Sequence, residues 1–155
     1  QQKSLEVIAH SGMATTADVG EYGTIHPCGK ETVGRRLALL ALSHDYGQTA
    51  IAADAPTYKS VEYRDGKAYV KFNVDKLGLS PMGTDIPGFE IAGSDKVFHP
   101  AKARLNKDHS IIDVWSEDVA EPAAVRYCFR NWCVGGLYNN FGVVAGPFRT
   151  DDWNL

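Results

Sequence analysis

A histidine and a proline, His26-Pro27, stand directly before a helical pattern, a placement that suits a catalytic base. The residues before them, 14–22 (ATTADVGEY), are typical of a strand or a turn. The backbone at His26 would then be held on both sides while its imidazole projects into a cleft, and general bases commonly occupy such loops. The alternative is that His26 only caps the helix or bonds a backbone group, and the residues alone favour this structural interpretation.

A histidine base also needs an acceptor that orients its ring and a nucleophile that it can activate. The candidate orienting residues are Asp18, Glu21 and Thr24, because they precede His26 closely in the chain. A serine nucleophile is missing, since there is no Gly-X-Ser-X-Gly motif and residues 47–49 (Gly-Gln-Thr) carry threonine after a helix end. If His26 is catalytic, its nucleophile lies outside this sequence.

The other histidines favour structural roles. His44 lies near the end of the helical pattern, where an imidazole complements the helix dipole, and His99 and His109 fall in strand and turn context. No spacing of histidines or cysteines is typical of a zinc site, and no glycine-rich loop carries the Lys-Ser/Thr pair that cradles phosphate. The sequence therefore predicts neither a metal nor a cofactor.

Three cysteines, an odd number, leave at least one thiol free or paired outside the chain. Cys128 and Cys133 are five residues apart and could bridge across a turn. Two separate half-buried thiols explain the same spacing equally well, so the cysteines do not identify the compartment.

The charge pattern excludes two classes of partner. The net charge is -3, and the 16 basic and 19 acidic residues are interspersed, so no basic face is available for nucleic acid or an anionic membrane. The longest apolar run, residues 37–42, is far shorter than the roughly 20 residues that span a bilayer. The opening residues, QQKSLEVIAHSGM, have no targeting pattern and are typical of the interior of a longer or processed protein.

Helical signals dominate the first part of the chain. The pattern predicts an amphipathic helix over residues 29–46, with Pro27 in its first turn and Gly47 as its C-terminal stop. We expect this helix to dock on an apolar surface through one stripe of side chains, namely Val33, Leu37, Leu40 and Ala41. Pro56 then breaks the chain at a domain boundary.

Strand signals dominate from about residue 57. Residues 58–64 and 67–74 alternate in polarity and flank Asp65-Gly66, which predicts a β-hairpin. Similar runs follow at GFEIAG, KVFHPAKARL, SIIDVW and AAVRYCF, whereas residues 75–87 are rich in Gly and Pro and predict a loop. Six or seven short strands without a helix among them predict an antiparallel β-sandwich or jelly-roll-like domain.

The segment 18–47, DVGEYGTIHPCGKETVGRRLALLALSHDYG, resembles the last motif block of the sialate O-acetylesterase family, carbohydrate esterases of the SGNH-hydrolase type. The family pattern is close to Asp-X-Gly-Glu, then Asp-Ile-His-Pro, an Asn-Lys or similar pair, Val-Gly-X-Arg-Leu-Ala-Leu and Tyr-Gly. Much of the rest is similar to that family's C-terminal region, in PTYKSVEYRDGKAYVKF, GFEIAG, AVRYCF and LYNNFGVVAGPFRTDDW. The resemblance covers nearly the whole chain.

The resemblance implies an α/β plus all-β architecture. Residues 1–50 would be the final strand, catalytic loop and last helix of an SGNH-type α/β domain, and residues 57–155 an accessory antiparallel β-sandwich. His26 matches the family's catalytic histidine. The serine nucleophile and the oxyanion hole have no counterpart here, so an upstream segment or chain would carry them. The substrate would be an O-acetylated sugar, sialic acid or another acetylated glycan, and the location extracytoplasmic: periplasmic, secreted or lysosomal.

One departure concerns the group that orients the imidazole. The family usually has Asp two places before the histidine, where this chain has Thr24, and the SGNH pattern's Asp three places before is Gly23. Glu21, Asp18, a backbone carbonyl or a group from the other segment would then take that role. The second hypothesis for the chain is a non-catalytic carbohydrate-binding or docking module, in which exposed aromatic side chains stack on sugars: Trp115, Trp132 and Tyr138.

Overall fold

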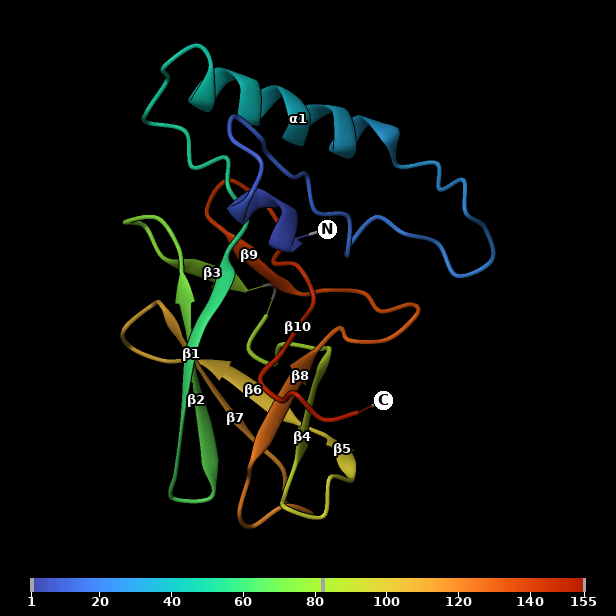
Figure 1. Cartoon of the computed structure of the whole chain (residues 1–155), viewed down its shortest axis with the longest axis vertical. Coiled ribbons are helices and arrows are strands. Elements are labelled where there is room, and N and C mark those ends of the chain that lie inside the picture. The colour runs from blue at the N-terminus through green and yellow to red at the C-terminus, as the bar shows by residue number, and fades with distance from the viewer. Residues whose placement is uncertain (1, 82, 155) are drawn as a thin grey trace.

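The computed structural model describes residues 2–81 and 83–154, and consists of one α-helix above a β-rich part (Figure 1). A short 3₁₀ helix, η1 (Gln2–Glu6), precedes α1 (Lys30–His44). Helix α1 lies within two residues of the predicted bounds. It ends as expected before Gly47, where the backbone N–H of Gln48 donates to the carbonyl of Leu42 (2.9 Å) and so satisfies a terminal acceptor.

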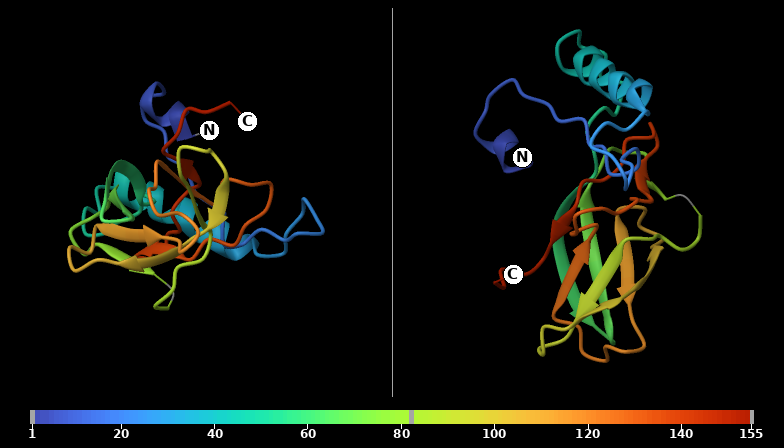
Figure 2. Two further views of the ribbon diagram at one scale, coloured as in Figure 1. Left: turned by 90° about the horizontal axis from the view of Figure 1, so that it is seen from below. Right: turned by 90° about the vertical axis from the view of Figure 1, so that its right-hand side faces the viewer.

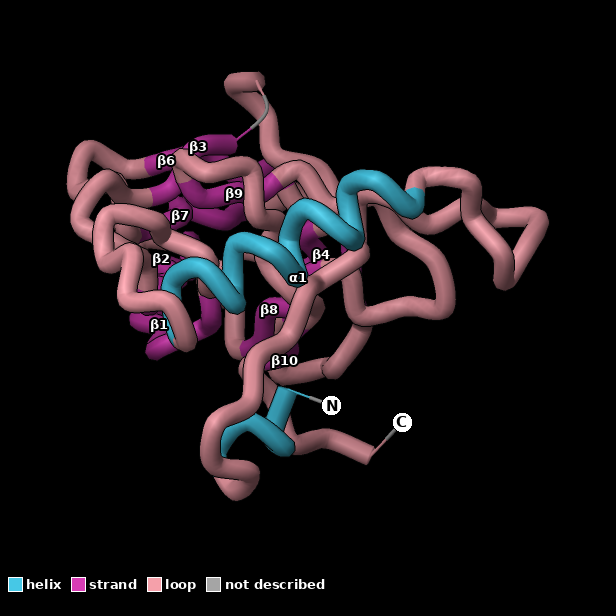
Figure 3. Tube along the Cα trace, turned by 90° about the horizontal axis from the view of Figure 1, so that it is seen from above, coloured by secondary structure: helices cyan, strands magenta, loops and turns pink. Residues whose placement is uncertain are grey.

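The face that α1 buries differs from the predicted apolar stripe. Leu40 is buried, but Leu37 is 54% exposed, and the second buried side chain of the helix is Arg36. Figures 2 and 3 show α1 lying across one end of the strands, so only a small part of its surface faces them. In the described chain the helix therefore docks largely through a polar side chain, because Arg36 finds hydrogen-bond acceptors at that end of the strands.

The second part of the chain is an antiparallel β-domain, as predicted. All six predicted runs contain strand. The strands are β1 (Thr57–Arg64), β2 (Lys67–Asn73), β3 (Leu79–Pro81), β4 (Phe89–Ala92), β5 (Phe98–Pro100), β6 (Lys102–Leu105), β7 (Ile111–Trp115), β8 (Ala124–Tyr127), β9 (Leu137–Asn139) and β10 (Phe148–Arg149). Asp65 and Gly66 join β1 to β2 with positive φ angles of 51° and 69°, as a tight hairpin turn of this type requires.

Two four-stranded sheets share one hydrophobic core. Their strand orders are β1-β2-β7-β6 and β10-β8-β4-β5. In the first sheet Val70 pairs with Ile112, and in the second Ile91 pairs with Val125; all four side chains are fully buried in the same cluster. In β2 and β7 every second side chain is buried in this core, and the two sheets stabilise each other by burying their facing surfaces.

Two details of the β-domain were predicted wrongly. The segment 75–87 was expected to be a loop, but it contains β3, which pairs with β9 in a separate two-stranded ribbon. A ribbon leaves each strand with a free edge, so Pro81 can end β3 although it has no N–H to donate. The run 96–105 is two strands, because the chain turns at Ala101 and passes from β5 in one sheet to β6 in the other.

The described residues before α1 contain no strand. Residues 2–29 hold η1 and a single bridge between Glu21 and Thr24. The final strand implied by the family resemblance is therefore absent from this stretch, where no neighbouring strand is present to complete a hydrogen-bonded ladder. The SGNH-type α/β domain stays a prediction.

Candidate active site

His26 lies in an exposed turn whose shape is fixed by neighbouring side chains. The backbone N–H of His26 donates to Oγ1 of Thr24 (3.0 Å). The backbone N–H of Cys28 donates to Oε1 of Glu21 (2.6 Å), and Glu21 also bridges Thr24 through the backbone. The turn is thus closed on both sides of His26, and α1 begins at Lys30, directly after it.

The three candidate orienting residues all bond groups other than the His26 imidazole. Thr24 and Glu21 accept hydrogen bonds from backbone N–H groups of the turn itself. The two carboxylate oxygens of Asp18 accept from the guanidinium of Arg36, at 2.7 and 2.6 Å. In this arrangement Thr24 and Glu21 shape the turn, and Asp18 binds Arg36. That one of these three residues orients the His26 imidazole stays a prediction.

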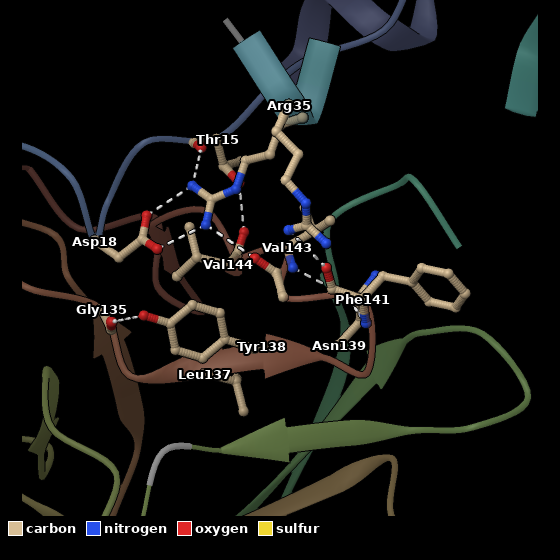
Figure 4. A network of polar contacts seen from close by, with 12 residues as sticks. Thr15, Asp18, Arg35, Gly135, Leu137, Tyr138, Asn139, Phe141, Val143 and Val144 are labelled. Carbon is tan, nitrogen blue, oxygen red and sulfur yellow. Dashed lines mark hydrogen bonds and ion pairs between the residues drawn. The ribbon is translucent and has the colours of Figure 1, made fainter. Parts of the chain in front are cut away.

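Arg36 attaches residues 15–18, which precede the His26 turn, to the β-domain. Arg36 is 1% exposed, and its guanidinium donates to the carbonyl of Thr15 (2.8 Å), to Asp18 and to the carbonyl of Gly142 (3.0 Å). Figure 4 shows this network, with Thr15 and Asp18 facing strand β9. A buried ion pair is stable only when further hydrogen bonds compensate its lost hydration, and the two carbonyls supply them.

The loop after β9 is fixed by a buried asparagine. The side-chain amide of Asn139 donates to the carbonyls of Ala52 (2.8 Å) and Asp54 (3.1 Å), and its carbonyl oxygen accepts from the backbone N–H groups of Phe141 and Val143. The amide therefore links residues 52–54, which connect α1 to β1, to the loop after β9, where the carbonyl of Gly142 accepts from Arg36. Because this hydrogen-bonding capacity is satisfied, burial of the polar side chain is tolerated.

The segment before the His26 turn lies against the β-domain. Oγ1 of Thr15 donates to the carbonyl of Val144 (2.5 Å), and the backbone N–H of Gly135 donates to the carbonyl of Ala17 (3.0 Å). Farther along, the ring of Tyr22 meets that of Trp132 with centroids 5.6 Å apart. The structure thus places the His26 turn beside the loop between β8 and β9.

A cleft of about 890 Å³ opens between the residues that precede the His26 turn and the β-domain, and His26 itself is not among the residues that line it. One wall is residues 13–17 and Gly20, another is the β8–β9 loop over residues 128–133, and η1 and β10 complete it. The cleft has both apolar and polar walls, a combination typical of small-molecule sites. Sequence reasoning did not predict it, because its walls are separated by more than a hundred residues in the chain.

The three aromatic candidates for sugar stacking have different surroundings. Trp132 is 44% exposed and lines the cleft. Trp115 is half-buried on the outer surface of its sheet, with Lys67 and Arg104 over its ring. Tyr138 is half-buried and donates to the carbonyl of Gly135 (3.3 Å); burial and the nearby charge of Asp18 raise the pKa of its hydroxyl. Of the three, Trp132 alone presents an accessible ring to the cleft.

All three cysteines are free, so the structure does not contain the Cys128–Cys133 bridge that the spacing left open. Burial and the neighbouring Cys133 raise the pKa of the Cys128 thiol. Both sulfurs pack against Gly88. Since a protonated thiol is a poor nucleophile, Cys128 contributes packing in this state.

Over residues 2–81 and 83–154, no three His, Cys, Asp or Glu side chains gather closely enough to hold a metal ion. Neither helix in these ranges has the length and apolar character needed to cross a bilayer.

Comparison with solved structures relates the chain to the carbohydrate esterases, whereas no protein-family model and no curated protein matches it. The chain is similar to a carbohydrate acetylesterase from Xanthomonas citri, with 38% identity and a TM-score of 0.77 over 88% of this chain. It covers 31% of that enzyme, so it spans about a third of its length. This similarity supports a role related to carbohydrate ester hydrolysis.

Proposed function

We propose that this chain is the C-terminal part of a serine carbohydrate O-acetylesterase and that His26 is its catalytic base. The observation that carries the proposal is the exposed His26 turn, closed on both sides by Glu21 and Thr24, in a chain similar to a carbohydrate acetylesterase. The substrate is an O-acetyl ester of sialic acid or of another glycan. An SGNH-type domain would supply the rest of the site.

The reaction that suits this arrangement is acyl transfer in two steps. The imidazole of His26 takes the proton of a serine hydroxyl as the serine oxygen attacks the acetyl carbonyl, and N–H groups stabilise the oxyanion. His26 then returns that proton to the sugar oxygen as the ester bond breaks. In the second step His26 deprotonates a water that attacks the acetyl-serine, which releases acetate and restores the serine hydroxyl.

Two parts of the proposal rest on the family resemblance. The serine and the oxyanion-hole groups belong to an upstream segment or chain that completes the site. The location is extracytoplasmic, where acetylated glycans are accessible. No cofactor is needed, because each proton and each bond in the two steps is accounted for by serine, histidine and water.

The substitution His26→Ala in the complete protein tests the proposal. We expect acetate release from an O-acetylated sugar to fall by at least about 100-fold, since a general base contributes 10²–10⁴ to the rate. His44→Ala is the matched control: His44 is also exposed but lies at the far end of α1, where its Nε2 bonds Asp54 (2.9 Å). Acetate release by His26→Ala at nearly the wild-type rate would refute the proposal.

A second candidate function is carbohydrate binding without catalysis. The exposed ring of Trp132 at the cleft favours it, because indole rings bind the apolar faces of sugars. A complete protein that binds glycans but releases no acetate from any O-acetylated sugar would favour this candidate over the esterase.

A further inference from the structure

The loop between β8 and β9 brings an aromatic side chain of the β-domain to the His26 turn. The rings of Trp132 and Tyr22 meet edge to face, with centroids 5.6 Å apart and planes at 79°. Tyr22 directly follows Glu21, whose carboxylate closes the His26 turn. Figure 1 shows the two loops projecting on the same side of the molecule. The aromatic pair therefore joins the β-domain to the turn that carries the proposed base.

Both rings are accessible in the part of the protein that the structure describes. Tyr22 is 84% exposed and Trp132 is 44% exposed. An indole left in water exposes a large apolar surface, which is unfavourable unless a ligand or another surface covers it. The edge-to-face contact restricts the orientation of the Trp132 ring, so a ligand that stacks on it loses little entropy to ordering the side chain.

The cleft beside Trp132 supplies hydrogen-bonding groups. Lys3, Glu6, Thr16 and Asn131 line it together with the indole. These donors and acceptors are exposed, so they can exchange bound water for the hydroxyl groups of a ligand. A pyranose ring has an apolar C–H face and a rim of hydroxyls. The aromatic ring and the polar wall match these two features.

We propose that Trp132, oriented by Tyr22, is the stacking platform of a glycan subsite that binds a sugar ring flanking the acetylated one. This inference rests on the proposed function and deepens it, because it specifies an acetylated oligosaccharide as the preferred substrate. No bond forms or breaks at this subsite. Trp132 therefore acts on substrate binding, and its loss affects KM for substrates long enough to reach it.

The test compares two substrates of the complete protein. For Trp132→Ala we expect KM for an acetylated oligosaccharide to rise about threefold to tenfold, as the loss of one aromatic contact predicts, with kcat unchanged. Hydrolysis of p-nitrophenyl acetate, which has no second ring, keeps its wild-type kcat/KM. Trp132→Phe retains a stacking ring and stays within about threefold of the wild-type KM. Trp115→Ala removes a tryptophan outside the cleft, and we expect it to leave kcat and KM unchanged for both substrates.

Two outcomes would overturn the subsite: an unchanged KM for the oligosaccharide in Trp132→Ala, or an equal loss on both substrates, which would indicate a structural role. Calorimetric titration with an unacetylated oligosaccharide separates the subsite from the esterase proposal. If the protein has no esterase activity but binds this ligand through Trp132, the proposed function fails and the subsite stands. If esterase activity is present and Trp132→Ala binds the ligand as tightly as wild type, the subsite fails and the esterase stands.

Discussion

At the scale of single residues, Gly88 shows how closely the sulfurs of Cys128 and Cys133 are packed in the β-domain. A Cβ at this position would lie 2.8 Å from the Sγ of Cys128 and 3.2 Å from the Sγ of Cys133, and the backbone φ is +94°. Any side chain there would meet both a steric contact and an unfavourable backbone conformation. Gly88 is therefore required by two sulfurs that lie forty or more residues later in the chain.

Gly88→Ala should lower the free energy of unfolding by about 2–4 kcal/mol, the sum of overpacking and backbone strain. Gly83→Ala is a matched control, because its φ is +87° and nothing lies within 4 Å of its Cβ position. We expect the free energy of unfolding of the control to fall by about 1 kcal/mol, from backbone strain alone. Urea unfolding of both variants measures the difference, and equal losses would show that the sulfur contacts do not matter.

The sequence predicted the loop that carries His26 but not the contacts that hold this loop to the rest of the molecule. The His-Pro pair before a helix is a local pattern, so the exposed turn could be predicted from adjacent residues. The partners of Arg36 could not, because Thr15 and Gly142 lie 21 and 106 residues away along the chain. Arg36 is a polar residue between apolar positions of the helical pattern, and a buried arginine on a helix has no local sequence signal.

At the scale of elements, the attachment of α1 depends on one of two adjacent arginines. Arg36 is buried and pairs with Asp18, whereas Arg35 is exposed and donates to the carbonyl of Phe141 (3.5 Å). Removing Arg36 would leave the largely buried carboxylate of Asp18 without its partner, which is far more costly than losing an exposed contact.

Arg36→Ala should destabilise the protein by about 3–5 kcal/mol, while Arg35→Ala should change the free energy of unfolding by less than about 0.5 kcal/mol. Hydrogen exchange of the α1 amides measures where the loss occurs, and we expect α1 and residues 13–20 to lose protection first. Protection of α1 in Arg36→Ala equal to that in Arg35→Ala would contradict the role assigned to this network.

The predicted apolar face of α1 was only partly right for a related reason. Periodicity identifies which residues share a face of a helix, but it does not say what covers that face. Leu40 is buried and Leu37 is not. The strands were predicted more accurately, because alternation of polarity and an Asp-Gly turn directly determine pairing between neighbours in the chain. β3 and β9 were not predicted, because each has three residues, which are too few to show an alternation of polar and apolar side chains.

At the scale of the whole molecule, the C-terminal segment is held to the second sheet by an ion pair. Arg126 of β8 donates two hydrogen bonds to Asp151, at 2.9 and 2.8 Å, and the carboxylate has no exposed surface. The hydrogen bonds from Arg126 lower the pKa of Asp151. The pair therefore contributes stability above the pKa of an unfolded Asp, about 3.9, and this contribution is lost as the pH falls through the lower folded value.

Asp151→Asn should flatten the dependence of stability on pH below about pH 4, and it should destabilise the protein at neutral pH. Glu117→Gln is the control, because Glu117 also has a lowered pKa, from Lys102, but is fully exposed to solvent. Urea unfolding at several values between about pH 2 and pH 7 measures both variants. A pH dependence of Asp151→Asn that matches the wild type would show that Asp151 is not the group responsible.

The edges of the two sheets bear on the behaviour of the protein at high concentration. An exposed, regular edge strand is a template on which another chain can add a strand. Here β10 has two residues, β5 has three and ends in Pro100, β6 carries Lys102 and Arg104, and the long edge strand β1 is interrupted by a bulge between Tyr58 and Ser60. Each of these four edges is too short, too charged or too irregular to seed intermolecular sheets, so the two four-stranded sheets are protected against growth by strand addition at their edges.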